Sequence, residues 1–227
     1  MTETILILGG TKEAAELAAK MATAKPSARI ISSLAGRTRE PKPLVGEMRI
    51  GGFGGPEGLA NWLRSENVDQ VIDATHPFAT QISSNAKQAC MATGTPLQVR
   101  TRRPWVERQG DRWQHVGDIG EAVEALPPNG RILLALGSQH IKPFAVRKDV
   151  WFLVRMIDAP KTPLSLHNHH LLLERPSPDW RDERAMLVKH GITMIICRNS
   201  GGAGAYAKVE AARNLDLPII MIGRADG

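Results

Sequence analysis

The hydrophobic positions of this chain fall into short continuous runs separated by longer mixed segments. The first run, TILILGG at residues 4–10, is apolar without alternation, which is typical of a parallel strand buried on both faces. The segment that follows, KEAAELAAKMAT at residues 12–23, is predicted as a helix. This order recurs almost from end to end. It predicts an α/β protein with mostly parallel, doubly wound sheets.

The same patterns divide the chain into two parts. The predicted strands cover residues 4–10, 28–34, 46–53, 68–75, 96–101, 131–137, 150–157, 192–198 and 218–224, with a further apolar run at 170–174. The predicted helices cover residues 12–23, 56–66, 78–93, 119–126, 182–191 and 205–215, with a short one at 138–145. The alternation stops over residues 100–118, which are polar and rich in turn formers. We therefore predict two domains, residues 1–100 and 101–227, with a ligand cleft between them.

Composition and charge indicate which class of partner the protein binds. The formal net charge of +6 favours an anionic partner, but aromatic residues make up only 4%, too few for a surface that stacks nucleic-acid bases. An acidic small molecule therefore fits better than a nucleic acid. The only cysteines, Cys90 and Cys197, form no CxxC pair, and the first apolar run is too short for a signal peptide or membrane span. The expected location is the cytoplasm, with no membrane partner.

A glycine turn between the first strand and the first helix is the first candidate binding site. GGTKEA at residues 9–14 matches the dinucleotide fingerprint GxGxxG/A in part, with Thr11 in place of the middle glycine. Gly9 suits a tight turn, Gly10 permits close approach of a phosphate, and the helix N-terminus favours an anion. An ordinary strand-to-helix turn is the alternative.

The stretch after the second predicted strand bears on the choice of cofactor. SSLAGRTR at residues 32–39 has no acidic residue for the ribose hydroxyl of NAD, but it contains Arg37 and Arg39. An arginine at this place would pair with the 2′-phosphate of NADP. A solvated basic loop is the alternative for either arginine.

DATHPFATQISSNA at residues 73–86 places Asp73, Thr75 and His76 at the carboxyl end of a predicted strand. Ligands bind at this edge of parallel sheets, so we expect residues 73–79 to form the floor of a reaction cleft. Pro77 suits the first helical position, which would make His76 the N-cap. His76 would then either take part in the chemistry or serve only as a cap.

Other motifs are less specific. Glycine-rich turns follow predicted strands at residues 51–58, 136–139 and 200–206, and together they suggest a large ligand with phosphate or carboxylate groups. HNHH at residues 167–170 has no third ligand at a usual spacing, so we predict no metal site. The motifs of serine hydrolases (GxSxG), zinc proteases (HExxH) and P-loop nucleotidases (GxxxxGK[ST]) do not occur.

Taken together, ILILGGTKEA, SSLAGRT, GGFGG, DATHPFATQISSNA and NSGGAGAYAKVEAA resemble, in this order, the precorrin-6A reductases of cobalamin biosynthesis. The resemblance covers nearly the whole chain. It implies two Rossmann-like domains, an N-terminal dinucleotide-binding domain and a C-terminal substrate and cofactor domain. It also implies NADPH as cofactor, reduction of one double bond of a polycarboxylate tetrapyrrole-derived ring to give precorrin-6B, and neighbouring enzymes of the pathway as further partners.

The resemblance also assigns roles to individual residues. The matching cofactor positions are Gly9, Gly10, Thr11, Arg37, Asp73, Thr75, Ser200, Gly201 and Gly202. His76 or Lys208 would supply the proton, with Tyr206 as a third candidate and solvent as the alternative. Arg155, Arg198 and Lys208 would bind substrate carboxylates. Cobalt-precorrin-6A reduction, another NADP-dependent reductase or epimerase, and a non-catalytic module that binds nucleotides or polyanions stay open as alternatives.

Overall fold

The computed structural model of the chain describes residues 2–36 and 43–224. The chain divides into two compact units, Met1–Arg102 and Arg103–Gly227, whereas the boundary predicted from the sequence lay between residues 100 and 101. Each unit contains one sheet, and every strand pair in both sheets is parallel. The prediction of a two-domain, doubly wound α/β fold is therefore confirmed.

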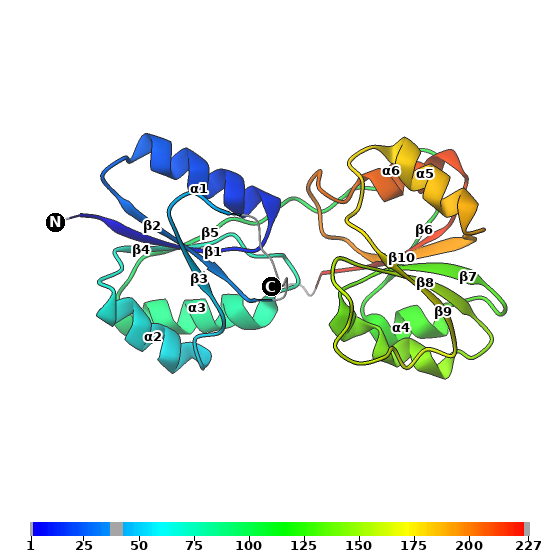
Figure 1. Cartoon of the computed structure of the whole chain (residues 1–227), viewed down its shortest axis with the longest axis horizontal. Helices are drawn as coiled ribbons and strands as arrows, with labels where there is room; N and C mark the ends of the chain where they lie inside the picture. The colour runs from blue at the N-terminus through cyan, green and yellow to red at the C-terminus, as the bar shows by residue number, and fades with distance from the viewer. Residues whose placement is uncertain (1, 37–42, 225–227) are drawn as a thin grey trace. The chain divides into compact units, whose positions relative to one another are not determined.

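The first unit is a five-stranded sheet in the order β3-β2-β1-β4-β5. Its elements are β1 (Thr4–Leu8), α1 (Lys12–Ala24), β2 (Arg29–Leu34), β3 (Glu47–Ile50), α2 (Gly55–Ser65), β4 (Gln70–Asp73), α3 (Thr80–Thr93) and β5 (Leu97–Val99). Helix α1 covers one face of the sheet, and α2 and α3 cover the other (Figure 1). In the central strand, Ile5 and Ile7 pack with α1, whereas Leu6 and Leu8 pack with α2 and α3. Burial on both faces explains the unbroken apolar run.

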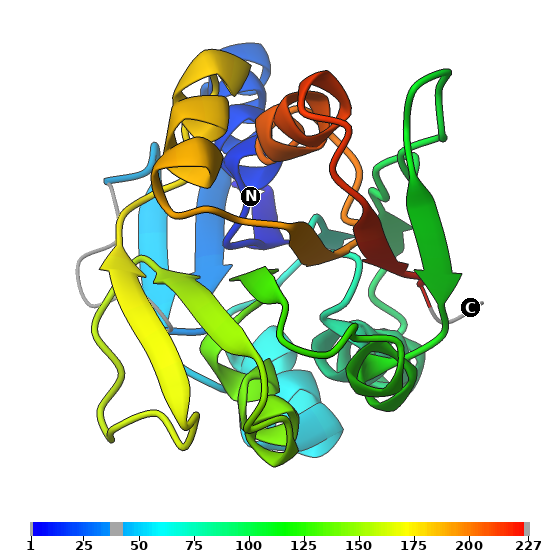
Figure 2. The ribbon, with the colours of Figure 1, turned by 90° about the vertical axis from the view of Figure 1, so that its right-hand side faces the viewer.

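The second unit is a six-stranded sheet in the order β6-β11-β10-β7-β8-β9. Its elements are β6 (Trp113–Val116), α4 (Ile119–Glu124), β7 (Arg131–Ala135), two 3-10 turns (Ser138–His140 and Lys142–Val146), β8 (Trp151–Met156), β9 (Asn168–Leu173), α5 (Trp180–Lys189), β10 (Met194–Arg198), α6 (Ala207–Asn214) and β11 (Ile219–Ile222). Helices α5 and α6 lie on one face of this sheet, and α4 and the 3-10 turns lie on the other (Figure 2).

Two local predictions in the second unit were wrong. Strand β6 lies inside residues 100–118, where the sequence predicted no strand. It is an edge strand that pairs only with β11, and Gln114 and His115 are exposed, so it lacks the apolar run of a central strand. The short helix predicted at residues 138–145 is replaced by the two 3-10 turns. Pro143 lies at the start of the second turn, where it cannot donate a helical hydrogen bond.

Each sheet has a point at which the strand order reverses. In the first unit this switch point lies between β1 and β4, and in the second it lies between β7 and β10. The loops at the carboxyl ends of these strand pairs diverge to opposite faces of the sheet, which leaves a crevice where ligands bind in open α/β sheets.

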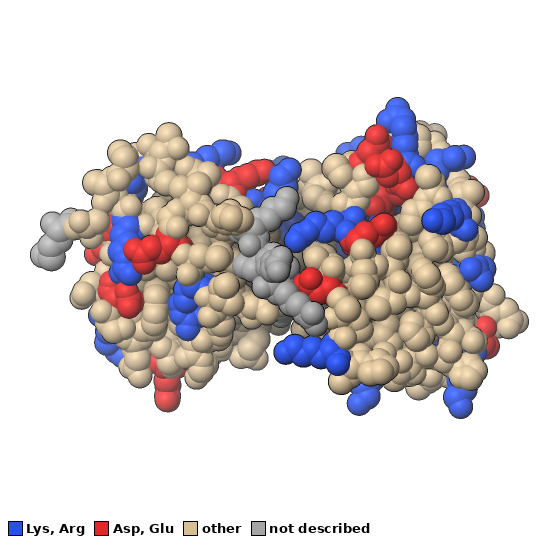
Figure 3. Space-filling model, in the orientation of Figure 1, with Lys and Arg blue, Asp and Glu red and all other residues tan. Residues whose placement is uncertain are grey.

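The surface shows no concentration of the positive charge on the face seen in Figure 3, where basic and acidic side chains are interspersed over both units. Among the described residues, no helix is long and apolar enough to cross a membrane.

Candidate functional site

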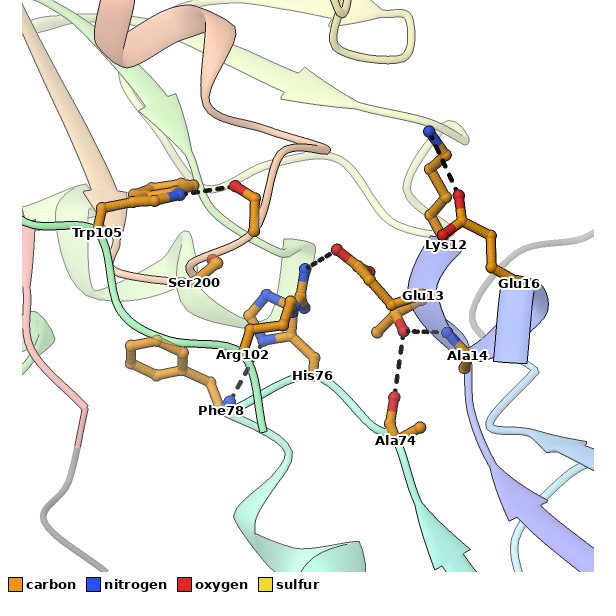
Figure 4. Close-up of polar contacts among 12 residues, drawn as sticks. Lys12, Glu13, Ala14, Glu16, Ala74, His76, Phe78, Arg102, Trp105 and Ser200 are labelled. Atoms are coloured by element: carbon orange, nitrogen blue, oxygen red, sulfur yellow. Dashed lines mark hydrogen bonds and ion pairs between the residues drawn. The ribbon is translucent and has the colours of Figure 1, made fainter. Parts of the chain in front are cut away.

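The switch point of the first unit is built around Thr11, the N-cap of α1. Its Oγ1 accepts a hydrogen bond from the amide of Ala14 (3.1 Å) and donates to the carbonyl of Ala74 (3.1 Å; Figure 4). One hydroxyl thus caps α1 and ties the turn after β1 to the end of β4. The positive end of the helix dipole and the free amides of the first turn favour an anion here.

Glycine is required at the two positions before Thr11 for different physical reasons. The amide of Gly9 donates to the carbonyl of Ser33 (3.0 Å), and a Cβ on Gly9 would lie 3.2 Å from that of Ala14, so the turn packs closely on α1. Gly10 has a φ of +101°, which disfavours any side chain, and the space where a Cβ would stand is open. The turn therefore offers room for a phosphate beside the helix N-terminus.

A cavity of about 460 Å³ lies at this switch point. Thr11, Ala74 and Thr75 line it, and so do Arg100 and Arg102 from the segment after β5. Nη1 of Arg102 lies 3.2 Å from Oε1 of Glu13, so part of the basic charge is balanced by the first turn of α1 (Figure 4). The predicted cofactor residues Thr11 and Thr75 are thus brought to one cavity.

Asp73 is buried and serves the backbone that follows it. Its Oδ1 accepts hydrogen bonds from the amide of Thr75 (3.0 Å) and from Oγ1 of Thr75 (2.7 Å). Oγ1 of Thr75 also lies 3.4 Å from Oγ of Ser83 in α3. Asp73 therefore fixes the shape of the loop, and Thr75 is the residue of the pair that reaches the cavity.

The prediction that Pro77 starts the next helix was wrong. Helix α3 begins at Thr80 and its N-cap is Ala79, so His76 does not cap it. Instead the amide of Ala79 donates to the carbonyl of His76 (2.7 Å), which closes a turn with Pro77 at its second position. Proline is favoured there because its fixed φ suits the turn. This hydrogen bond delays the helix.

The imidazole of His76 belongs to the same turn. Its Nδ1 accepts from the amide of Phe78 (3.3 Å), so the ring proton resides on Nε2 when the imidazole is neutral (Figure 4). The neutral ring can therefore donate a hydrogen bond only through Nε2.

The GGFGG loop after β3 is shaped by its own backbone and by Arg49. The guanidinium of Arg49 donates to the carbonyls of Gly51 and Gly52 (2.7 Å each) and lies 3.7 Å from the centre of the Phe53 ring. Three glycines of this loop have positive φ: Gly51, Gly54 and Gly55. The glycines are therefore required by the turn itself, whether or not a ligand approaches it.

At the switch point of the second unit, Arg198 ends β10. Its Nη1 lies 3.1 Å from Nε2 of His140, which follows β7. Its Nη2 lies 3.7 Å from the place where a Cβ of Gly137 would stand, so the guanidinium covers the turn after β7. The sequence singled out this turn as a glycine loop, but a single histidine in a short polar turn carries no signal of its own.

Ser200, Gly201 and Gly202 follow Arg198 directly. Gly201 and Gly202 have φ values of +66° and +71°, and the backbone carbonyl of Arg103 approaches Gly201 so closely that a Cβ would collide with it. Ser200 contacts the carbonyl of Arg198 through both its amide (2.7 Å) and its hydroxyl (3.3 Å). The predicted loop is therefore a tight turn at the carboxyl end of β10.

Lys208 and Tyr206 already have partners inside the second unit. Lys208 is buried, its Nζ donates to the carbonyl of Ala205 (2.6 Å), and burial lowers its pKa. The hydroxyl of Tyr206 accepts from Nη2 of Arg213 (2.8 Å). The predicted roles of both residues as proton donors, and of Lys208 in binding a substrate carboxylate, stay predictions.

Arg155 is also buried, with 4% of its side chain exposed. Its Nη1 lies 2.7 and 2.9 Å from the two carboxylate oxygens of Glu183, whose side chain is 2% exposed. This ion pair engages the guanidinium of Arg155 inside the second unit, and its predicted contact with substrate carboxylates stays a prediction.

Two further predictions concern a residue and a motif outside these clusters. Arg37 lies outside the described residues, so its role stays a prediction. The HNHH motif falls at the start of β9, where His170 stacks on His190 with ring centres 5.4 Å apart. Among the described residues, no group of three or more His, Cys, Asp or Glu side chains is placed to hold a metal ion.

The fold and these switch points define a class: doubly wound α/β proteins of two units with a glycine turn at a switch point, a turn that suits an anion. Comparisons with known proteins identify the family within this class. Residues 4–227 match the family model described as precorrin-6x reductase CbiJ/CobK, and the chain belongs to this family. The predicted family is thus confirmed, and so is the prediction that the protein is an oxidoreductase.

Individual relatives agree with the family. The chain is 46% identical to a precorrin-6A reductase of Rhodococcus erythropolis, over 97% of this chain and 88% of the relative. It is 29% identical to a cobalt-precorrin-6A reductase of Priestia megaterium, over 97% of this chain and 90% of the relative. A solved structure, CobK precorrin-6A reductase, is 43% identical with a TM-score of 0.93, covering 100% of this chain and 89% of that one.

Proposed function

We propose that this protein catalyses the NADPH-dependent reduction of precorrin-6A to precorrin-6B in cobalamin biosynthesis. The observation that carries the proposal is the switch point of the first unit, where the capped N-terminus of α1 and the loop of residues 73–79 share one cavity. The higher identity to the precorrin-6A reductase than to the cobalt enzyme, 46% against 29%, favours the cobalt-free substrate.

The residues of the first unit fit a dinucleotide. Gly9, Gly10 and the first turn of α1 would hold the diphosphate, because the open space at Gly10 lies beside amides that favour anions. Arg37 would pair with the 2′-phosphate. Thr75 would approach the nicotinamide, held in place by Asp73. Ser200, Gly201 and Gly202 in the second unit would hold a further anionic group of the ligands.

When bound, NADPH supplies the hydride, and the protein has to supply a proton to the neighbouring carbon. His76 is the residue proposed for this step: its imidazolium form would carry a proton on both nitrogens, with the bond from the amide of Phe78 to Nδ1 broken, and giving up the proton on Nε2 would leave the neutral ring. The proton would pass from Nε2 to the substrate directly or through one water. Arg198 would bind a substrate carboxylate. A cytoplasmic location and contacts with neighbouring pathway enzymes are part of the same proposal.

Turnover separates this proposal from its alternatives. The purified protein should oxidise NADPH only when precorrin-6A is present, as followed by the loss of nicotinamide absorbance. A protein that binds NADPH to saturation without oxidising it in the presence of precorrin-6A would be a binding module. Faster turnover of the cobalt-containing substrate would instead support the cobalt-precorrin-6A alternative.

Arg37 should set the preference for NADPH over NADH. Replacing Arg37 by alanine should weaken NADPH binding about tenfold to a hundredfold, because a charge-assisted contact with phosphate contributes about 1.5 to 3 kcal/mol. NADH binding should change little, since it has no 2′-phosphate. Fluorescence titrations of both cofactors test this. Equal losses for NADPH and NADH would contradict the assignment.

Arg198 should contribute to substrate capture. Arg198→Ala should raise the KM for precorrin-6A about tenfold, the lower range for a charge-assisted contact. The KM of the unmodified protein should also rise with salt, because exposed charges are screened over about 8 Å at physiological ionic strength. Arg181→Ala is the matched control, since 71% of that side chain is exposed and it lies on the outside of α5. The same KM for both variants would argue against Arg198.

A further inference from the structure

Trp105 lies in the second unit and is fastened to the loop of residues 199–205, called here the glycine loop. Its amide donates to Oδ1 of Asn199 (2.7 Å), and its carbonyl accepts from Nδ2 of the same side chain (2.9 Å). Both Trp105 and Asn199 are buried. The backbone of Trp105 is therefore held by Asn199 through both its amide and its carbonyl, and this fixes the position of the indole relative to the loop.

Protein donors bind five carbonyl groups of the glycine loop, among them that of Ala203, which accepts from the amide of Tyr206 (3.3 Å). Nε1 of Trp105 donates to the carbonyl of Gly202 (2.7 Å; Figure 4), and Nζ of Lys208, 4.9 Å from the centre of the Trp105 ring, donates to that of Ala205 (2.6 Å). Arg224 donates to the carbonyls of Asn199 and Ser200 (2.9 Å each). The loop is thus held almost entirely by hydrogen bonds that its backbone carbonyl groups accept.

This arrangement determines where the amides point. In a planar trans peptide, the N–H of one residue points away from the carbonyl of the residue before it. Because the carbonyl of Gly202 faces the indole, the amide of Ala203 faces away from it. Residues 203 and 204 are exposed, and in the described part of the chain the amides of residues 202–205 donate to no protein acceptor. Successive amides beside residues with positive φ form a concavity that suits an anion.

We propose that Trp105 is a positioning residue for the reaction. Through its bond to the carbonyl of Gly202, it holds the amide of Ala203 toward an anionic oxygen of a ligand, either a phosphate of the cofactor or a carboxylate of the substrate. This inference rests on the proposed function, because that function brings an anion to the glycine loop. Neither the motifs nor the charge pattern pointed to Trp105, since it lies in the polar stretch of residues 100–118 where the sequence shows no strand or helix pattern.

Trp105→Phe tests the proposal by removing the Nε1–H donor while keeping an aromatic ring beside Lys208 and Tyr206. Trp113→Phe is the matched control. Its Nε1 is also buried in the second unit, and the described residues offer it no hydrogen-bond partner. We expect Trp105→Phe to raise one KM about tenfold, the effect of losing one hydrogen bond to a buried carbonyl, with kcat nearly unchanged. Trp113→Phe should leave both KM values at those of the unmodified protein.

The two substrates identify the anion. A higher KM for NADPH alone would mean that the loop holds a cofactor phosphate, and a higher KM for precorrin-6A alone would mean that it holds a carboxylate. Unchanged KM values in Trp105→Phe, with normal turnover of the unmodified protein, would overturn the positioning role and leave the proposed function intact. An unmodified protein that fails to oxidise NADPH with precorrin-6A would overturn both.

A second variant tests the proposal if Trp105→Phe lowers the stability of the protein. If Trp105→Phe melts earlier than Trp113→Phe, benzothienylalanine at position 105 keeps the shape of the indole and replaces only the N–H by sulfur. The same rise in KM with the melting temperature of the unmodified protein supports the proposal. A KM that returns to normal in this variant would show that Trp105 acts only by filling space.

Discussion

Replacing His76 by alanine should lower kcat about a hundredfold, the lower range for a positioned proton donor, while NADPH affinity stays nearly unchanged. The reason is geometric. Nδ1 faces the amide of Phe78, so Nε2 is the atom from which the imidazolium form would give its proton, and alanine removes it. The measurement is kcat at saturating NADPH and precorrin-6A, together with a fluorescence titration of NADPH and the melting temperature of each variant.

His76→Asn separates the two roles of the side chain. The amide oxygen of asparagine can accept from the amide of Phe78 and preserve the turn, but its nitrogen is not an acid at neutral pH. A proton donor should therefore lose as much kcat in His76→Asn as in His76→Ala. If His76→Asn turns over normally and only His76→Ala melts earlier, the imidazole serves the turn alone and solvent supplies the proton.

Thr11→Val should have the opposite signature. It removes the hydroxyl that caps α1 and binds the carbonyl of Ala74, so the turn that would hold the diphosphate loses both of its side-chain hydrogen bonds. NADPH should bind more weakly and the protein should lose about 1 kcal/mol of stability, while kcat at saturating cofactor stays close to normal. Thr11→Ser keeps the hydroxyl and is the control. A fall in kcat without a change in NADPH affinity would contradict this role for Thr11.

The elements that the sequence predicted well are those whose pattern has one physical cause. A run such as residues 4–8 is apolar because both faces of β1 are buried, and all five residues of this strand are buried. Edge strand β6 needs no such run, because only one side of it is paired. The turn between β1 and α1 could be predicted for a similar reason: glycines and a threonine between a buried strand and a helix are a local signature.

The remaining differences depend on contacts between distant residues or on a choice between two local structures. Pro77 suits both the first position of a helix and the second position of a turn, and the bond from Ala79 to the carbonyl of His76 decides for the turn. Trp105 acts through Asn199 and Gly202, which are more than ninety residues away in the chain. No spacing rule connects them.

The ion pair of Arg155 also depends on a residue distant in the sequence, Glu183. Breaking this pair should cause the largest stability change that we expect. Glu183→Ala should lower the free energy of unfolding by about 3 to 5 kcal/mol, because it leaves the buried guanidinium of Arg155 without its carboxylate. Urea or thermal unfolding measures the loss. Arg112→Ala is the control for the second unit, since its ion pair with Asp216 is exposed and should contribute less than about 1 kcal/mol.

The double variant Arg155→Met with Glu183→Leu distinguishes a structural pair from a substrate contact. Two apolar side chains of similar volume remove both charges at once, so most of the stability lost in Glu183→Ala should return. If Arg155 acts only through Glu183, the refolded double variant should also keep the KM for precorrin-6A of the unmodified protein. A double variant that is stable but has a much higher KM for precorrin-6A would show that the guanidinium of Arg155 reaches the substrate, as the sequence first suggested.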